Sequence, residues 1–292
     1  MLTWSEFYNQ FSIQLNEQQQ SAVQSVTGPV LLLAVPGSGK TTVLVTRLGY
    51  MIFCRGIAPE KILTVTYTVA ATKDMSERFA SRFGQDLADR LEFRTINGIC
   101  ARVIQYYGRK TARTAFSLLT DEKRISAILS AIYQKTERVY PTEGDLKNVR
   151  TLITYIKNRM LNEKEIEALD ETSEIRISAI YKEYCKHLRE NQLMDYDDQM
   201  VYAYNMLLKI PWLLEYFQNQ YPYICVDEAQ DTSKIQHAII ALLASRTGNL
   251  FMVGDEDQSI YGFRAAYLEA LLEFEQHHPG AKVLLMEENI RS

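Results

Sequence analysis

Hydrophobic residues follow two different periods along the chain. Short aliphatic runs that suit buried strands alternate with stretches whose apolar residues recur at i, i+3, i+4 and i+7, the spacing of one helix face. This alternation is typical of βαβ units. The strand candidates are 30–35, 62–66, 223–226, 250–253 and 282–286. The pattern therefore predicts an α/β fold in which helices flank a parallel sheet.

The middle of the chain carries the helical period alone. The apolar residues of 125–132 form one stripe, and those of 146–156 form a second with the same spacing. No strand candidate interrupts them convincingly. We therefore expect an all-helical insertion domain at 107–196, within an α/β domain made of residues 1–106 and 197–292.

The composition is that of a globular protein with a large core. Of the 292 residues, 47% are hydrophobic. No cationic stretch precedes an apolar run at the start, and no apolar run is long enough to span a bilayer, so we expect a cytoplasmic protein without a membrane partner. The four cysteines lack the close pairs of zinc sites, and we interpret them as reduced core thiols.

The charge gives only a weak indication of partners. The net charge is -4, so the molecule as a whole is not basic in the way of many nucleic-acid-binding proteins. Between residues 101 and 193 basic residues nevertheless outnumber acidic ones. Nucleic-acid binding would therefore have to be local, and charge alone favours it no more than it favours solvated helix faces.

A glycine-rich segment lies between the first strand candidate and the helical stretch after it. It reads Ala34-Val35-Pro36-Gly37-Ser38-Gly39-Lys40-Thr41. This spacing between a strand and a helix predicts a P-loop, in which backbone N–H groups and the helix N-terminus surround phosphate oxygens. Lys40 is expected to reach the terminal phosphates of a nucleotide, and Thr41 to bind Mg²⁺ through its hydroxyl.

Two adjacent carboxylates end the strand candidate at 223–226. Because successive side chains of a strand point in opposite directions, we expect Asp227 to hold Mg²⁺ while Glu228 orients and deprotonates an attacking water. On its own, such a pair more often begins a helix. Together with the P-loop, it favours hydrolysis of the nucleotide over phosphate transfer to a bound acceptor.

A third segment follows the strand candidate at 250–253. Its acidic loop leads to Gln258 and then to Tyr261, Phe263 and Arg264. Because the loops at the carboxyl ends of parallel strands gather at one edge of a sheet, this loop should lie beside the P-loop. Gln258 is expected to hydrogen-bond the γ-phosphate and to relay its loss to the residues that follow. A packed turn is the alternative for the aromatic part.

In their order along the chain, these segments resemble the motifs of superfamily 1A helicases of the UvrD and Rep type. The resemblance covers nearly the whole chain, and its most specific parts are VDEAQDT at 226–232 and VGDEDQSIYGFRAA at 253–266. The segment at 195–198 also resembles the one that returns from the helical 1B insertion to the family's core. The resemblance implies a RecA-like P-loop NTPase fold and Mg²⁺-dependent ATP hydrolysis that drives 3′ to 5′ movement along single-stranded DNA.

The same resemblance implies roles for individual residues. It places Gln19 on the adenine base and Arg291 near the γ-phosphate, beside the catalytic Lys40, Glu228 and Gln258. With ATP and Mg²⁺ as cofactors, the implied nucleotide-binding residues are Gln19, Ala34, Val35, Pro36, Gly37, Ser38, Gly39, Lys40, Thr41 and Thr42. The residues implied to contact single-stranded DNA, or its junction with duplex, are Thr66, Tyr67, Thr95, Asn97, Tyr261, Phe263 and Arg264.

Four positions depart from the family's pattern. Val69 and Ala70 stand where the family usually has Asn-Lys, so a polar and a basic strand contact are absent or supplied elsewhere. Asn97 replaces the usual His, and Ile290 replaces a Tyr that commonly stacks on adenine. Because of Ile290, we expect weaker nucleotide affinity or weaker selectivity for the base.

The family continues into a second RecA-like domain, 2A, and binds ATP between its two domains. Because the chain stops at the segment that resembles motif IV, we expect an N-terminal piece that lacks domain 2A. An arginine finger can accelerate phosphoryl transfer by about 10³ to 10⁵. The chain alone is therefore expected to bind ATP, to hydrolyse it poorly and to unwind nothing.

Three other functions are weighed against this one. A helicase–nuclease subunit of the RecB or AddA type would share these motifs, because its nuclease would lie beyond residue 292. A DNA-binding adaptor that uses nucleotide only as a switch would keep the fold, but intact Lys40, Asp227 and Glu228 argue against it. A P-loop kinase of small metabolites leaves the sequence SIYGFRAA unexplained.

Overall fold

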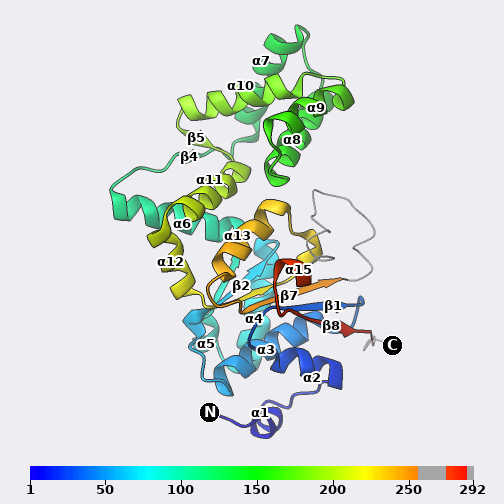
Figure 1. Cartoon of the computed structure of the whole chain (residues 1–292), viewed down its shortest axis with the longest axis vertical. Helices are drawn as coiled ribbons and strands as arrows, with labels where there is room; N and C mark the ends of the chain where they lie inside the picture. The colour runs from blue at the N-terminus through cyan, green and yellow to red at the C-terminus, as the bar shows by residue number, and fades with distance from the viewer. Residues whose placement is uncertain (256–273, 288–292) are drawn as a thin grey trace.

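The computed structural model describes residues 1–255 and 274–287. In this part of the chain, six parallel strands form one sheet in the order β3-β2-β6-β7-β1-β8 (Figure 1). The strands are β1 (Val30–Ala34), β2 (Ile62–Thr66), β3 (Glu92–Thr95), β6 (Tyr223–Val226), β7 (Leu250–Asp255) and β8 (Lys282–Met286). The predicted fold class and the five predicted strands are therefore confirmed, whereas β3 was not expected.

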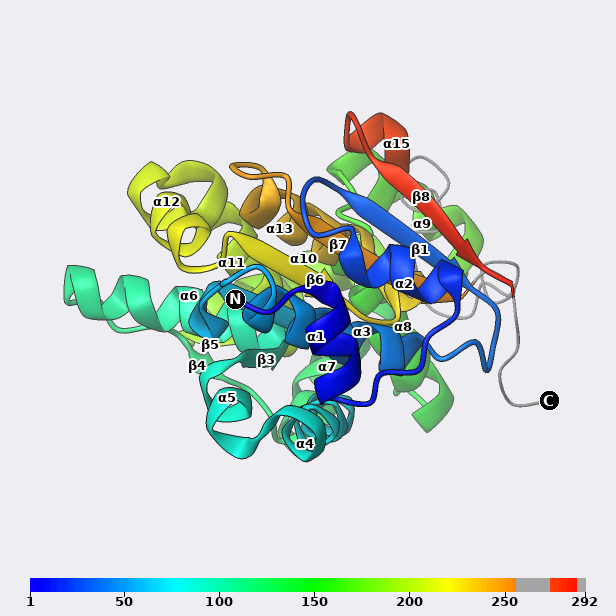
Figure 2. The same cartoon turned by 90° about the horizontal axis from the view of Figure 1, so that it is seen from below.

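The four central strands contribute to two hydrophobic cores, because successive side chains face opposite sides of the sheet. Val30 and Leu32 of β1 lie in one core, and Leu31 lies in the other. The helices that share the first core are α1 (Trp4–Gln10), α2 (Glu17–Gln24), α3 (Lys40–Phe53), α4 (Val69–Phe83) and α5 (Gln85–Arg90). The long helices that share the second are α6 (Ile96–Thr111), α11 (Tyr196–Lys209), α12 (Pro211–Gln220) and α13 (Lys234–Ala244). Figures 1 and 2 show the two groups on opposite sides of the sheet.

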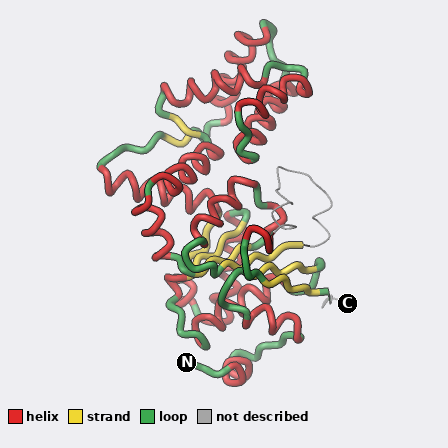
Figure 3. Tube along the Cα trace, viewed as in Figure 1, coloured by secondary structure: helices red, strands yellow, loops and turns green. Residues whose placement is uncertain are grey.

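A third core belongs to the helical part of the chain, above the sheet in Figure 3. Its elements are α7 (Glu122–Glu137), α8 (Glu143–Asn158), α9 (Glu163–Ser173) and α10 (Ile177–Glu190). The expectation that this region is all-helical is wrong in one detail, because β4 (Ser117–Leu118) pairs in parallel with β5 (Leu193–Met194). Strands of two residues are too short to leave a period in the sequence. The expected boundary between 106 and 107 falls inside α6, and the division into domains stays a prediction.

A buried charge cluster joins α8 to the start of α11. The ammonium of Lys157 lies 2.7 Å from Oδ2 of Asp195 and 2.8 Å from Oδ1 of Asp198, and only 1% of the lysine side chain is exposed. Burial by itself lowers the pKa of Lys157, but the two carboxylates outweigh this and raise it. Asp195 also caps α11 by accepting a hydrogen bond from the backbone of Asp198. The segment at 195–198 therefore connects α11 to α8 through these buried ion pairs.

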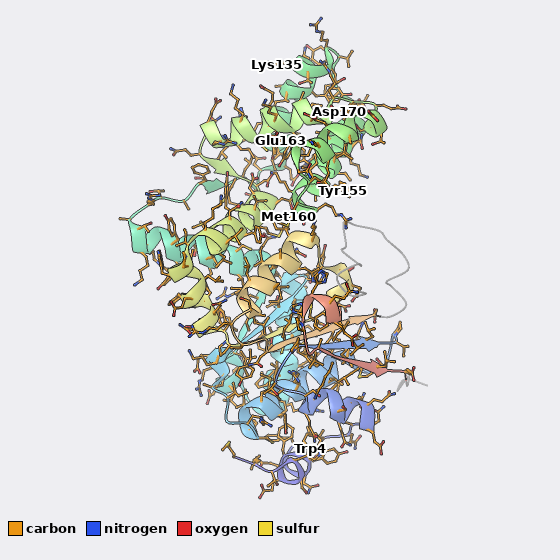
Figure 4. The ribbon with its side chains drawn as sticks, viewed as in Figure 1. Trp4, Lys135, Tyr155, Met160, Glu163 and Asp170 are labelled. Carbon is orange, nitrogen blue, oxygen red and sulfur yellow. The ribbon has the colours of Figure 1, made fainter. Side chains whose placement is uncertain are left out.

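The remaining elements are short, namely η1 (Pro59–Lys61), η2 (Ala229–Asp231) and α15 (Phe274–His277). All four cysteines are free, with Cys100 and Cys225 buried and the other two partly buried. No helix within the described ranges is long and apolar enough to cross a membrane. The molecule is elongated, with Trp4 near one end and Lys135 at the other (Figure 4).

Candidate nucleotide site

The glycine-rich segment forms a tight loop between β1 and α3. Ala34 ends β1 beside Asp255 of β7 and Met286 of β8, so the loop begins at the carboxyl edge of the sheet. Gly37 and Gly39 have φ angles of 83° and 86°, a left-handed conformation that glycine adopts at little cost. The turn therefore needs glycine at both positions, and it delivers Lys40 to the first turn of α3.

Gln19 of α2 stabilises this loop by a hydrogen bond. Its Nε2 donates a hydrogen bond of 2.8 Å to the carbonyl of Ser38, and its Oε1 accepts one of 3.0 Å from the backbone of Asn16. The hydroxyl of Ser38 is buried and has no hydrogen-bond partner. An unpartnered buried donor in a glycine loop fits a phosphate oxygen, which would satisfy it. The expected contact of Gln19 with an adenine base stays a prediction.

The two carboxylates lie beyond the end of β6, which stops at Val226. The expectation that strand alternation separates them is therefore wrong, because a bend begins at Asp227 and Glu228 adopts a left-handed conformation with φ 51°. Such a conformation costs a non-glycine residue on the order of 1–3 kcal/mol. Two hydrogen bonds hold it in place, from the Glu228 backbone to Oδ1 of Asp227 (3.0 Å) and from Nε2 of Gln230 to Oε2 of Glu228 (2.5 Å).

Lys40 connects the P-loop with the two neighbouring strand ends. Its ammonium forms an ion pair with Asp255 at the end of β7 and lies 3.6 Å from Oε2 of Glu228. About 15% of the lysine side chain is exposed, so a ligand can reach it. Three segments that are far apart in the sequence thus meet at one edge of the sheet, as the positions of β6, β7 and β1 require.

Asp227 lies at this edge of the sheet in a poorly solvated position. Burial, and then the charge of Glu228, raise its pKa to about 6, while the hydrogen bond from the Glu228 backbone and the charge of Lys40 act against the rise. A bound cation would favour the carboxylate form. The hydroxyl of Thr41 and the carboxylate of Asp227 are oxygen ligands of the kind Mg²⁺ prefers, so these residues suit that ion.

Asp255 and Gln230 are the residues of this site that the sequence did not single out. Both are buried, and Oε1 of Gln230 accepts a hydrogen bond of 3.0 Å from the backbone of Asp255. Each stands inside a segment with a strong motif, but spacing within a segment does not reveal a contact between segments. The sheet order supplies that information.

The described residues expected to contact DNA lie at the ends of β2 and β3. Thr66 is buried, and its hydroxyl is 2.6 Å from that of Thr72, whereas Tyr67 is 42% exposed. Thr95 caps α6 by accepting a hydrogen bond of 3.1 Å from the Gly98 backbone, at the rim of an open groove of about 1010 Å³. Oδ1 of Asn97 is buried without a hydrogen-bond partner. The role of these residues in DNA binding stays a prediction.

The other expected site residues lie outside the described part of the chain. They are Gln258, Tyr261, Phe263, Arg264 and Arg291.

Comparison with known proteins identifies a family. The model of the UvrD/REP helicase N-terminal domain matches residues 15–279. The chain is 35% identical to the ATP-dependent DNA helicase PcrA of Bacillus subtilis over 290 residues, and 34% identical to that of Staphylococcus epidermidis over 281 residues. The corresponding helicase of Staphylococcus aureus is 33% identical. These matches cover 95–97% of the chain but only 38% of each relative, so the chain spans well under half of the relatives' length.

Proposed function

The chain belongs to the UvrD/REP helicase family, and we propose that it binds ATP with Mg²⁺ at the P-loop as part of a motor that moves 3′ to 5′ along single-stranded DNA. The observation that carries this proposal is the position of Lys40, between the carboxylates of Glu228 and Asp255 and directly after the glycine loop. A cation held at this edge of the sheet suits the terminal phosphates of a nucleotide. The names of the relatives favour a helicase motor over a nuclease subunit or an adaptor.

The residues of the site divide the chemistry among them. The loop backbone and the Ser38 hydroxyl bind phosphate oxygens, and Lys40 neutralises the terminal phosphates. Thr41 and Asp227 would hold a Mg²⁺ ion, which would supply positive charge against the charge that develops on the phosphates. Glu228 accepts the proton of the attacking water, and its Oε2 lies 3.6 Å from the Lys40 ammonium.

The site also lies next to a residue that we propose to bind DNA. A small cavity of about 20 Å³ is lined by Asp227 together with Thr66 and Tyr67. The exposed ring of Tyr67 can stack on a base of any identity, which a motor that moves along any sequence requires. A shift at the end of β6 during hydrolysis would therefore move the surroundings of Tyr67, because Asp227 and Tyr67 line the same cavity.

Glu228→Gln separates nucleotide binding from hydrolysis. The variant keeps a side chain of the same shape but cannot accept the proton, so ATP should bind with nearly unchanged affinity while hydrolysis stimulated by single-stranded DNA falls by at least about 10². Fluorescent-nucleotide titration and a phosphate-release assay measure the two quantities in the protein that contains this chain. Lys40→Ala is the matched control, because it should lose binding itself. Equal hydrolysis rates in the wild type and Glu228→Gln would rule out Glu228 as the base.

A further inference from the structure

We propose that Asp255 forms an ion pair with Lys40 in the nucleotide-free site and that the phosphates of a nucleotide replace Asp255 on Lys40. This exchange changes the position of Glu228 through Gln230. The inference rests on the proposed function, because it concerns the same nucleotide site. It assigns positioning roles to two residues that do not themselves carry out the reaction. The contacts that support it form a closed ring of four residues, in which Asp255 takes part through both its side chain and its backbone N–H.

The first half of the ring is the ion pair between Lys40 and Asp255. A lysine that must bind phosphate is here already neutralised by a carboxylate from the neighbouring strand. Bringing a triphosphate to Lys40 places negative charges next to Asp255, and like charges at close range repel each other. The phosphates must therefore displace the carboxylate from Lys40, or the carboxylate weakens their binding. In either case Asp255 opposes nucleotide binding.

The second half of the ring passes through Gln230, which is only 4% exposed. Its amide uses both ends, accepting a hydrogen bond from the backbone N–H of Asp255 at 3.0 Å and donating one to Oε2 of Glu228 at 2.5 Å. Because a planar amide keeps its two ends at a fixed separation, a shift of Asp255 moves the hydrogen bond that Glu228 accepts. Lys40, 3.6 Å from the same Glu228 oxygen, closes the ring.

Close packing makes this link stiff. The Cα of Gly254 approaches Gln230 so closely that a Cβ at that position would lie 3.3 Å from Oε1 of Gln230 and 3.6 Å from the Cβ of Ala229. Glu228 itself is held in a left-handed conformation that the Gln230 hydrogen bond helps to maintain. A change at the end of β7 can therefore alter the position of Glu228 without a large movement of the backbone.

Nucleotide titrations of Asp255→Asn and Asp255→Glu test the first step. With ATP in the absence of Mg²⁺, Asp255→Asn should bind more tightly than the wild type, by on the order of tenfold, because the competing charge is removed. Asp255→Glu keeps the charge and should bind like the wild type. Glu60→Gln, which removes an exposed carboxylate paired with Arg90, is the control for a general change in charge. A merely structural role for Asp255 predicts the opposite sign, with weaker binding by Asp255→Asn.

Gln230→Met tests the second step, because methionine has a similar length but neither donates nor accepts these hydrogen bonds. In ATP hydrolysis by the protein that contains this chain, kcat should fall while KM stays within about twofold. A rise in KM with an unchanged kcat would overturn the link through Gln230. If the wild type binds ATP and Asp255→Asn binds no more tightly, the inference fails and the proposed function stands. If the wild type binds no nucleotide, both fail.

Discussion

Replacing Lys157 with Met should strongly destabilise the protein. The ammonium of Lys157 is buried and lies 2.7 Å and 2.8 Å from the carboxylates of Asp195 and Asp198. Methionine fills nearly the same volume but leaves both carboxylates buried without a cation. Removing one partner of a buried ion pair costs about 3–5 kcal/mol, because the remaining charge is uncompensated. We expect Lys157→Met to lose free energy of unfolding in that range.

Urea unfolding followed by circular dichroism measures the effect. Lys135→Met is the matched control, because Lys135 also pairs with a carboxylate, Glu183 at 3.1 Å, but does so at the exposed end of the helical part (Figure 4). An exposed pair is screened by water, so this substitution should change the free energy of unfolding little. Equal effects of the two substitutions would show that the buried cluster does not hold α8 to α11.

The pH dependence provides a second check on the same variant. Burial raises the pKa of Asp198, and the charge of Lys157 acts against this rise. Without Lys157, the pKa of Asp198 should climb further above its unfolded value, so the folded variant takes up a proton as the pH falls. Its deficit in free energy of unfolding relative to the wild type should therefore shrink between pH 7 and pH 5. A constant deficit across this range would refute the electrostatic explanation.

Three further predictions concern other parts of the molecule. Gly49→Ala should destabilise by about 1–3 kcal/mol in urea unfolding, since its Cβ would lie 2.3 Å from the packed ring of Phe83, whereas Gly144→Ala, 3.6 Å from its nearest neighbour, should be neutral or stabilising. Asp227 has a folded pKa of about 6, above its unfolded value, so its charge opposes folding above pH 6 and this cost is relieved as the pH falls. Asp227→Asn should therefore raise the free energy of unfolding by roughly 1–3 kcal/mol at pH 7.5 in metal-free buffer, and lose that advantage by pH 4. Tyr67→Ala should weaken binding of a mixed-sequence oligonucleotide by about 1–3 kcal/mol in a low-salt anisotropy titration, while an unchanged affinity would remove Tyr67 from the DNA-binding residues.

The sequence predicted the elements whose signal is local. Short runs rich in β-branched and aliphatic residues, such as Ile62–Thr66, predicted buried strands between helices, and the structure confirms them. The edge strand Glu92–Thr95 was missed because it is short, half-buried and rich in charge, so it lacks the apolar run of a central strand. The Ser117–Leu118 strand is shorter still.

For the candidate site too, the sequence predicted only the features that are encoded within one segment. The glycine loop and the Asp-Glu pair were identified from spacing within single segments, and the structure brings Lys40 to 3.6 Å from Glu228. The ion pair with Asp255 depends on β7 lying between β6 and β1, which no local pattern encodes. The left-handed conformation of Glu228 was equally hidden, because its hydrogen bond from Gln230 forms only in the folded turn.

The most direct test is a crystal structure of the chain with a non-hydrolysable ATP analogue and Mg²⁺. We predict phosphate density inside the loop of Gly37 and Gly39, with the Lys40 ammonium on the terminal phosphates, and the Mg²⁺ ion between Thr41 and Asp227. A loop that stays empty at saturating nucleotide, or a nucleotide bound elsewhere with Lys40 still on Asp255, would contradict the account.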